Sequence, residues 1–387
     1  MRILIWCTTM SFGGGTRLLS NLLPAIARQD DMELIRLVVS SQMQAIAPFD
    51  ELGHTCANIE IAYFDGDIQS PEGTSFYHDC HVVYYFWPHQ MKFKPINRPT
   101  ICTYHDTTIL DFVPPFTTGT YIRNYWKSSK EWLEHTTSVI VPSNYVRDRI
   151  ISHFGSHCQA TVIPYAIAPN DVSSGSIRPE IAAKLPPDYI VYPANTSPHK
   201  NHYNLLLAYS RFSQRKRLPL VLFGYHTDLL ICEPPNWPEV PSIATLVSLI
   251  RRTGLRVGED FYALGYLSDQ DIMPVIRGAK ALIMPTLSEG GGLPVFEALR
   301  LKVPVLCSDI PVMREHLDHW NTTEKVAWFD PESPDSIAGA IEQFVANYDH
   351  YKAIADQAVL HAENWDDLAR KYIHVFRRSY LKYYGQM

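Results

Sequence analysis

Two glutamates and a run of glycines give the sequence its strongest chemical signal. Glu289 and Glu297 are separated by seven residues, and glycines occupy positions 290 to 292 between them. The segment follows a short apolar run and precedes a helical pattern, so N–H groups at the start of that helix can bind phosphate oxygens. Because a carboxylate repels a diphosphate, we expect both glutamates to bind neutral hydroxyl groups of one ligand. The structural alternative is a glutamate that caps the helix.

Two further segments carry groups that suit phosphate. Glycines 13 to 15 lie where an apolar run ends and a helical pattern begins, and backbone amides at such a turn can approach an anion. Their spacing is not G-x-G-x-x-G, so the dinucleotide-binding fingerprint is absent. Lys200 follows another apolar run, where its ammonium would neutralise a leaving diphosphate. A structural turn and a surface lysine are the alternatives.

Metal-binding patterns are weak. The spacing D-x-D occurs twice, at residues 65–67 and 269–271, and such pairs can hold a divalent cation. Both copies lie in polar, turn-like sequence away from the segments above. The 16 histidines and 7 cysteines form neither H-E-x-x-H nor C-x-x-C. We therefore expect neither a bound metal nor a cofactor.

The elements that must position these residues alternate along the chain. Apolar runs of strand length alternate with helical patterns, which predicts βαβ units and parallel sheets. Predicted strands of a first series cover residues 2–6, 35–39, 59–64, 82–86, 100–104, 138–141 and 161–163. Those of a second series cover residues 189–192, 220–223, 261–264, 281–284, 303–307 and 326–329. Residues 168–183, rich in Pro, Ser and Asn, have the composition of a linker.

This pattern predicts an α/β protein with two doubly wound, Rossmann-like domains, 1–170 and 186–362. Ligands of such sheets bind at the carboxyl ends of the strands, so we expect the domains to face a central cleft. Residues 363–387 predict an amphipathic helix with a basic face. We expect it to pack back on the N-terminal domain, and contact with an anionic membrane is the alternative.

Composition narrows the classes of partner. The 387 residues carry a formal charge of −6, which argues against nucleic-acid binding through a broad basic face. No apolar run approaches the roughly 20 residues that span a bilayer, and the N-terminus lacks a signal-peptide pattern. The seven cysteines are odd in number and scattered, as expected of reduced thiols. We predict a cytoplasmic protein, with peripheral contact at the inner face of the cell membrane as a further hypothesis.

Residues 288–299, which read S-E-G-G-G-L-P-V-F-E-A-L, resemble the E-x7-E motif of family four, or group 1, glycosyltransferases. These are retaining enzymes with the GT-B fold of two Rossmann-like domains. Further segments match the family in the expected order and extend the resemblance over essentially the whole chain: residues 13–17, 104–106, 141–143, 162–164, 192–202, 264–267 and 302–311.

The resemblance implies a role for each matching residue. Glu289 would bind hydroxyls of the donor sugar, Glu297 the nucleotide ribose, and Lys200 the diphosphate. His105 would lie near the reacting sugar, so Lys200, Glu289 and His105 are the predicted catalytic residues. Further donor contacts are implied at Gly14, Gly15, Asn195, Gly265, Tyr266, Gly290, Gly291, Gly292 and Leu293.

Two positions depart from the family pattern. Asn195 stands where many relatives have an arginine that adds a second cation on the diphosphate. Either Lys200 acts with another cation, such as Arg17, or the negative charge of the diphosphate is stabilised less than in relatives that have the arginine. Tyr165 stands where relatives often have asparagine, a change expected to affect domain packing or the cleft more than the chemistry.

The resemblance implies a retaining hexosyltransferase. Its donor would be a UDP- or GDP-linked sugar and its acceptor a saccharide or a lipid-linked sugar, in bacterial surface polysaccharide biosynthesis. The acceptor side rests on two aromatic and basic segments, 84–98 and 121–130, for which core packing is the alternative. A sugar-nucleotide epimerase on the same fold and a non-catalytic nucleotide-sugar-binding protein are the competing functions.

Overall fold

The protein is described from a computed structural model. The structure describes residues 1–9, 14–44, 49–89, 91–113, 117–156, 158–166, 175–232, 241–360 and 363–385. These residues form two compact units. The first lies within Met1–Val113, Thr117–Ala166 and Glu363–Met387, and the second within Ile167–Ala362. In the described ranges, no helix is long and apolar enough to cross a bilayer.

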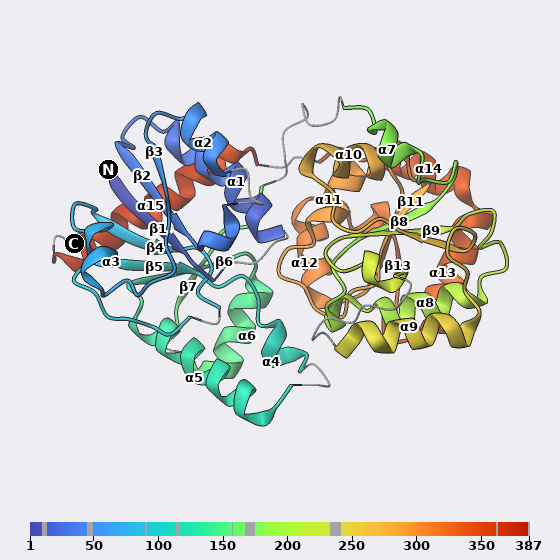
Figure 1. The fold of residues 1–387 in the computed structure, drawn as a ribbon, viewed down its shortest axis with the longest axis horizontal. Helices are drawn as coiled ribbons and strands as arrows, with labels where there is room; N and C mark the ends of the chain where they lie inside the picture. Colours follow the sequence, from blue (N-terminus) through green and yellow to red (C-terminus); the bar gives the residue numbers. More distant parts are fainter. Residues whose placement is uncertain are drawn as a thin grey trace. The chain divides into compact units, whose positions relative to one another are not determined.

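The first unit is built around a parallel sheet (Figure 1), and its strand order is β3-β2-β1-β4-β5-β6-β7. Its strands are β1 (Arg2–Cys7), β2 (Leu34–Val39), β3 (Ile59–Tyr63), β4 (Val82–Tyr85), β5 (Thr100–Thr103), β6 (Ser138–Val141) and β7 (Ala160–Val162). Its helices are α1 (Gly14–Ala27), η1 (Ser41–Met43), α2 (Phe49–Thr55), α3 (Pro71–Ser75), α4 (Thr108–Asp111), α5 (Gly119–His135), α6 (Asn144–Phe154) and α15 (Trp365–Tyr383).

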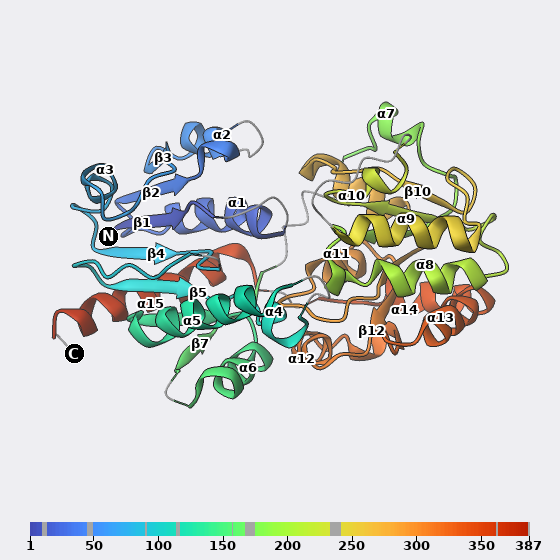
Figure 2. The same cartoon turned by 60° about the horizontal axis from the view of Figure 1, so that its bottom comes forward.

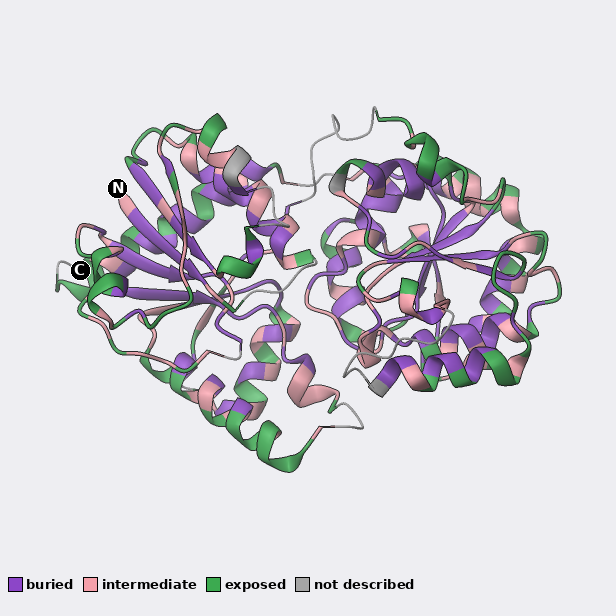
Figure 3. Ribbon diagram, viewed as in Figure 1, coloured by how far each residue is buried: buried purple, intermediate pink, exposed green. Residues whose placement is uncertain are grey.

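Helices cover both faces of this sheet. Ile3 and Ile5 of β1 belong to a core that also contains apolar residues of α1 and α15. Leu4 and Trp6 point to the opposite face and pack with residues of α5 and α6. Alternate side chains of a strand point to opposite faces, which explains why β1 is apolar from Ile3 to Cys7. Figure 3 shows the central strands of the sheet as mostly buried and the outer helix surfaces as exposed.

The last helix, α15, forms for local reasons and is held by this core. Asn364 caps its first turn, with Oδ1 accepting the Asp367 N–H at 2.8 Å. Its buried residues recur at helical spacing, and they are Trp365, Leu368, Ala369, Tyr372, Ile373, Val375, Phe376 and Ser379. They contact α1, β4 and β5 (Figure 2). The helix therefore completes the first unit from the far end of the sequence.

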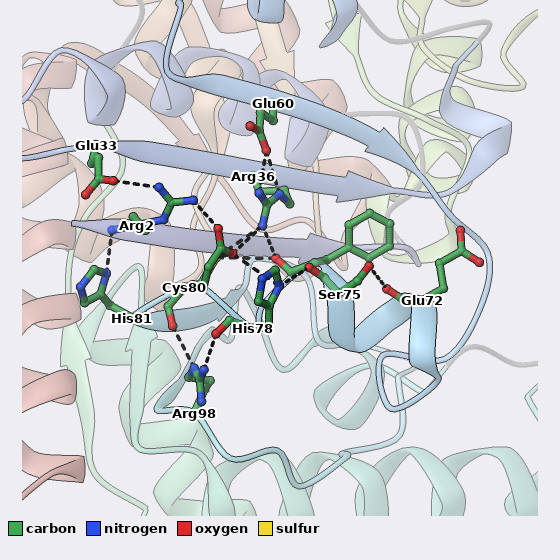
Figure 4. Close-up of polar contacts among 12 residues, drawn as sticks. Arg2, Glu33, Arg36, Glu60, Glu72, Ser75, His78, Cys80, His81 and Arg98 are labelled. Carbon is green, nitrogen blue, oxygen red and sulfur yellow. Dashed lines mark hydrogen bonds and ion pairs between the residues drawn. The ribbon is translucent and has the colours of Figure 1, made fainter.

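A charged cluster closes the amino-terminal ends of β1 and β2 (Figure 4). Arg2 and Arg36 both bind Asp79, and Arg2 also binds Glu33 at 2.8 Å. Burial raises the pKa of Asp79, but hydrogen bonds from Arg36 and Arg2 outweigh this and hold the pKa well below its usual range. The cluster lies at the end of the strands opposite to the carboxyl ends, so it stabilises the unit rather than forming part of the predicted site.

The second unit has its own parallel sheet, with strand order β10-β9-β8-β11-β12-β13. Its strands are β8 (Ile190–Pro193), β9 (Leu220–Phe223), β10 (Phe261–Ala263), β11 (Ala281–Met284), β12 (Val305–Ser308) and β13 (Val326–Phe329). Its longer helices are α8 (His202–Arg211), α9 (Pro241–Thr253), α10 (Asp269–Gly278), α11 (Leu293–Arg300), α12 (Pro311–His319), α13 (Pro334–Ala346) and α14 (Tyr348–Asp356). The short ones are α7 (Pro179–Ala182), η3 (Pro198–Lys200), η4 (Asp228–Leu230) and η5 (Thr323–Lys325).

All predicted strands are present within two residues of their expected bounds. Of the predicted linker at 168–183, residues 175–183 are described and contain the short helix α7. The rest of that linker lies outside the described residues, as does Gly13 of the first glycine segment.

Candidate functional site

Topology places the two strongest sequence signals at one edge of the second sheet. The strand order reverses between β8 and β11, which pair in parallel through Ile190–Ala281 and Val191–Leu282. The loops that follow these strands, 194–201 and 285–292, therefore leave the sheet side by side. Such a switch point is where doubly wound sheets bind ligands.

Hydrogen bonds join the two loops directly. The His199 carbonyl accepts the Leu287 N–H at 2.8 Å and the Thr286 hydroxyl at 3.1 Å. The Asn201 side chain donates to the Pro285 carbonyl at 2.8 Å from a left-handed backbone conformation, with φ of +60°. Asparagine tolerates this conformation better than most residues. The loops thus form one connected support for the residues between them.

Lys200 and Glu289 form an ion pair on this support. Lys200 Nζ donates to Glu289 Oε1, and the two side chains are 21% and 9% exposed. Two residues that are 89 positions apart in sequence are thus in direct contact. The residue predicted to bind the diphosphate and the residue predicted to bind the sugar therefore lie together, and the charges of the two side chains neutralise each other.

The glycines after Glu289 lead into α11. Gly292 adopts φ of +59° directly before the helix. A Cβ atom there would lie 2.4 Å from Met313 Sδ, so both this close approach and the left-handed backbone favour glycine. In the first turn of α11, Pro294 has no N–H and the Val295 N–H donates to the Gly292 carbonyl at 3.1 Å. The Leu293 N–H and the amides of the glycine loop before it are therefore the groups that we expect to face an anion. Glu297 lies inside α11 and is 5% exposed, and its contact with ribose stays a prediction.

The neighbouring strand ends hold the remaining predicted donor contacts of this unit. Gly265 follows β10 with φ of +72°, and its carbonyl accepts the Gly224 N–H at 2.8 Å. Tyr266 is 49% exposed. Asn195 uses its Oδ1 to accept the Ser197 N–H at 3.1 Å, so it shapes the loop after β8 and adds no charge.

The predicted residues of the first unit gather around Trp87. A Cβ on Gly15 would lie 3.1 Å from Trp87 Cζ3, whereas Gly14 is exposed with open space around it. The His105 ring stacks on Trp87 with centroids 4.7 Å apart. The strand order of the first sheet reverses between β1 and β4, and Gly15 and Trp87 follow these two strands.

His105 has both ring nitrogens engaged. The Phe86 carbonyl lies 2.6 Å from Nε2 and can only accept, so Nε2 carries the proton. Nδ1 then accepts the Tyr165 hydroxyl at 2.6 Å. A proton transfer through His105 would first have to break one of these bonds, and its role near the reacting sugar stays a prediction. The Tyr165 hydroxyl thus contacts a predicted catalytic residue, and the effect of this position on the chemistry stays a prediction.

The structure places part of the aromatic segment that was predicted to bind the acceptor. Tyr84, Tyr85 and Phe86 lie in the cores of the first unit, so core packing explains these aromatics.

In the D-x-D pairs, Asp67 binds Lys94 at 2.9 Å, and Asp271 binds Arg178 through both oxygens. Over the described ranges, no group of three or more His, Cys, Asp or Glu residues is placed to hold a metal.

Comparison with known families decides the assignment. Residues 174–361 match the model for glycosyl transferases group 1, and residues 77–171 match the model for glycosyltransferase family 4. The chain belongs to the group 1 glycosyltransferases. The match over 174–361 includes the loops that carry Lys200 and Glu289, so the family resemblance seen in the E-x7-E segment is confirmed.

Relatives and a solved structure agree with this family. The O-antigen chain mannosyltransferase B of Escherichia coli is 27% identical over 286 residues, which are 71% of this chain and 67% of that protein. The serotype-specific mannosyltransferase WbdA of Escherichia coli is 24% identical over 57% of this chain, but the match covers only 24% of WbdA. The crystal structure of Anabaena HepE in complex with UDP and glucose superposes with a TM-score of 0.65 at 15% identity, covering 100% of both chains. The GT-B fold is confirmed.

Some residues that shape the site of this glycosyltransferase escape sequence reasoning. Asn201 lies within the family-like loop, but its bonds to the Pro285 and Pro331 carbonyls join segments far apart in sequence. His316 on α12 binds the Gly290 carbonyl at 2.9 Å, and nothing in its local sequence marks it. Only the packing of α12 against the glycine loop reveals the His316 contact.

Two buried histidines indicate that the folded state of this glycosyltransferase loses stability in acid. Burial lowers the pKa of His105 and of His202 to about 3, whereas both titrate near about 6.5 in an unfolded chain. Below that pH the unfolded state binds more protons, so the free energy of unfolding falls as the pH falls. The slope is about 1.4 kcal/mol per pH unit for each such proton. Urea unfolding at pH 7 and pH 5 measures it.

The matched variants are His202→Leu and His374→Leu. Both His202 ring nitrogens are buried without hydrogen-bond partners, so an apolar side chain of similar size is tolerated there and removes one titrating group. His374 is exposed on α15, and its replacement should leave the slope unchanged. A His202→Leu protein with the wild-type pH dependence would contradict the prediction.

Proposed function

We propose that this glycosyltransferase transfers a hexose, with mannose as the first candidate, from a UDP- or GDP-linked donor. The acceptor is a saccharide or a lipid-linked sugar in bacterial surface polysaccharide biosynthesis. The relatives are by name an O-antigen chain mannosyltransferase and a serotype-specific mannosyltransferase, and the HepE structure contains UDP and glucose. The observation that carries the proposal is the Lys200–Glu289 pair beside the start of α11.

The proposed roles follow from the chemistry of these groups. The Lys200 ammonium and the N–H groups at the start of α11 neutralise the leaving diphosphate, where negative charge develops as the sugar bond breaks. Glu289 accepts hydrogen bonds from sugar hydroxyls, and the buried Glu297 does the same for ribose. Gly14 and Gly15 approach the diphosphate with backbone amides, and His105 contacts the sugar.

We further propose that transfer retains the anomeric configuration by front-face substitution. A double displacement needs a carboxylate nucleophile on the far side of the sugar. Glu289 does not suit that role, because its carboxylate is paired with the cation proposed for the leaving diphosphate. The departing phosphate oxygen then takes the acceptor proton, and the protein supplies positioning and charge stabilisation.

Thermal unfolding with UDP, GDP and ADP, followed by the matching sugar nucleotides, tests the donor, since a ligand bound only by the folded state raises its apparent stability. We expect one base to stabilise the protein and one of its sugar nucleotides to stabilise it further. Transfer to a saccharide acceptor, followed by NMR of the new linkage, tests retention. No stabilisation by any diphosphate would refute the donor assignment, and an inverted linkage or a glycosyl adduct on Glu289 or Asp106 would refute front-face substitution.

A further inference from the structure

Helix α12 lies directly behind the glycine loop. Met313 and His316 are three residues apart on this helix, so they share one face. The Met313 sulfur occupies the space that a Cβ on Gly292 would need. His316 Nε2 lies 2.9 Å from the Gly290 carbonyl oxygen. Two neighbouring side chains of α12 thus contact the loop at two of its three glycines.

The bond to Gly290 fixes the protonation of the His316 ring. His316 is 4% exposed, and burial lowers its pKa below the usual range, so the ring is neutral at pH 7. A carbonyl oxygen can only accept a hydrogen bond. The single ring proton must therefore lie on Nε2, and His316 is the donor.

The same bond orients the next amide. In a trans peptide, the carbonyl of one residue and the N–H of the next point in opposite directions. Because the Gly290 carbonyl points at His316, the Gly291 N–H points away from α12. Glycine has wide conformational freedom, so without an anchor the peptide between Gly290 and Gly291 can rotate and turn its carbonyl, instead of its N–H, toward an anion.

We propose that His316 is a positioning residue for the donor diphosphate, which acts by holding the Gly290–Gly291 peptide with its N–H directed at the phosphate oxygens. The inference rests on the proposed function of the Lys200–Glu289 site. It assigns to α12, which contributes no residue to the predicted donor contacts, the task of preorganising that site.

The test compares His316→Leu with His316→Gln. Leucine cannot donate a hydrogen bond, whereas the glutamine amide places a donor near the former Nε2. Isothermal titration with UDP and GDP should show diphosphate binding weakened about tenfold in His316→Leu, equivalent to one net hydrogen bond, and within about twofold of wild type in His316→Gln. Binding of uridine or guanosine, which lack phosphates, should be unchanged in both.

His319→Leu is the matched control, because His319 is exposed on the same helix. Should His316→Leu fail to fold, His316→Asn replaces it, since its shorter amide retains polarity but does not reach Gly290. Wild-type diphosphate affinity in the non-donating variant would overturn the proposal, as would equal loss in the glutamine variant or equal weakening of nucleoside binding. A wild-type protein that binds no nucleoside diphosphate would overturn the proposed function as well.

Discussion

Lys200→Ala is expected to lower kcat for sugar transfer by roughly 10²–10³-fold. The ammonium of Lys200 lies beside the start of α11, and the predicted diphosphate departs toward it. Removing it takes away the positive charge proposed to stabilise the leaving group. Asn195 supplies no second cation, because its side-chain amide is neutral, and its Oδ1 accepts the Ser197 N–H. The loss should therefore exceed that in relatives with an arginine at that position.

The control for this variant is Lys216→Ala, since Lys216 is an exposed lysine of the same unit whose partner is Glu259. It should transfer sugar at the wild-type rate. Lys200→Ala also leaves Glu289 without its countercharge, so unfolding is measured alongside activity. Full transfer by a folded Lys200→Ala protein would remove the diphosphate assignment.

Glu289→Gln should lower the rate of sugar transfer but raise the affinity for the nucleoside diphosphate, although these two properties usually fall together. Transfer should drop by about 10²-fold, because a neutral amide binds the sugar hydroxyls less strongly than a charged carboxylate. Affinity for the bare nucleoside diphosphate should instead rise by about threefold to tenfold. In the wild type the diphosphate must displace the Glu289 carboxylate from Lys200, and in the variant it meets an unpaired ammonium.

Calorimetry with UDP and GDP at low and high salt measures the second effect. The gain should shrink as salt increases, because it comes from an attraction between charges. Glu332→Gln removes an exposed carboxylate of the same unit and should change neither property. Weaker diphosphate binding in Glu289→Gln would show that the ion pair does not compete with the donor.

Much of the fold follows from the sequence because its signals are local. The strands of both series are apolar runs between turns, and parallel strands buried on two faces must read that way. The amphipathic pattern of residues 365–383 predicts a helix, and its apolar stripe fills the core of the first sheet. Helix α7 was not expected within the predicted linker, because four helical residues carry no periodic signal.

In the site, too, some residues could be predicted from local sequence, whereas the contacts between segments could not. Lys200, Glu289 and Glu297 lie in segments whose residue types and spacing have a chemical meaning by themselves. The Lys200–Glu289 contact, by contrast, depends on β8 and β11 becoming neighbours. The bonds of His316 and Tyr165 come from side chains whose partners lie in other segments. Tertiary packing, rather than any local pattern, makes such contacts.

The position of α15 in the first unit has a consequence for synthesis. The strands of the second unit, β8 to β13, lie between residues 190 and 329, so that unit has all of them once about residue 330 has been made. The first sheet is complete much earlier, after β7, but Trp365, Tyr372 and Phe376 do not yet cover it. During translation this apolar face stays uncovered until α15 has been made. A nascent chain stalled before residue 365 would therefore be a substrate for chaperones that bind apolar surfaces.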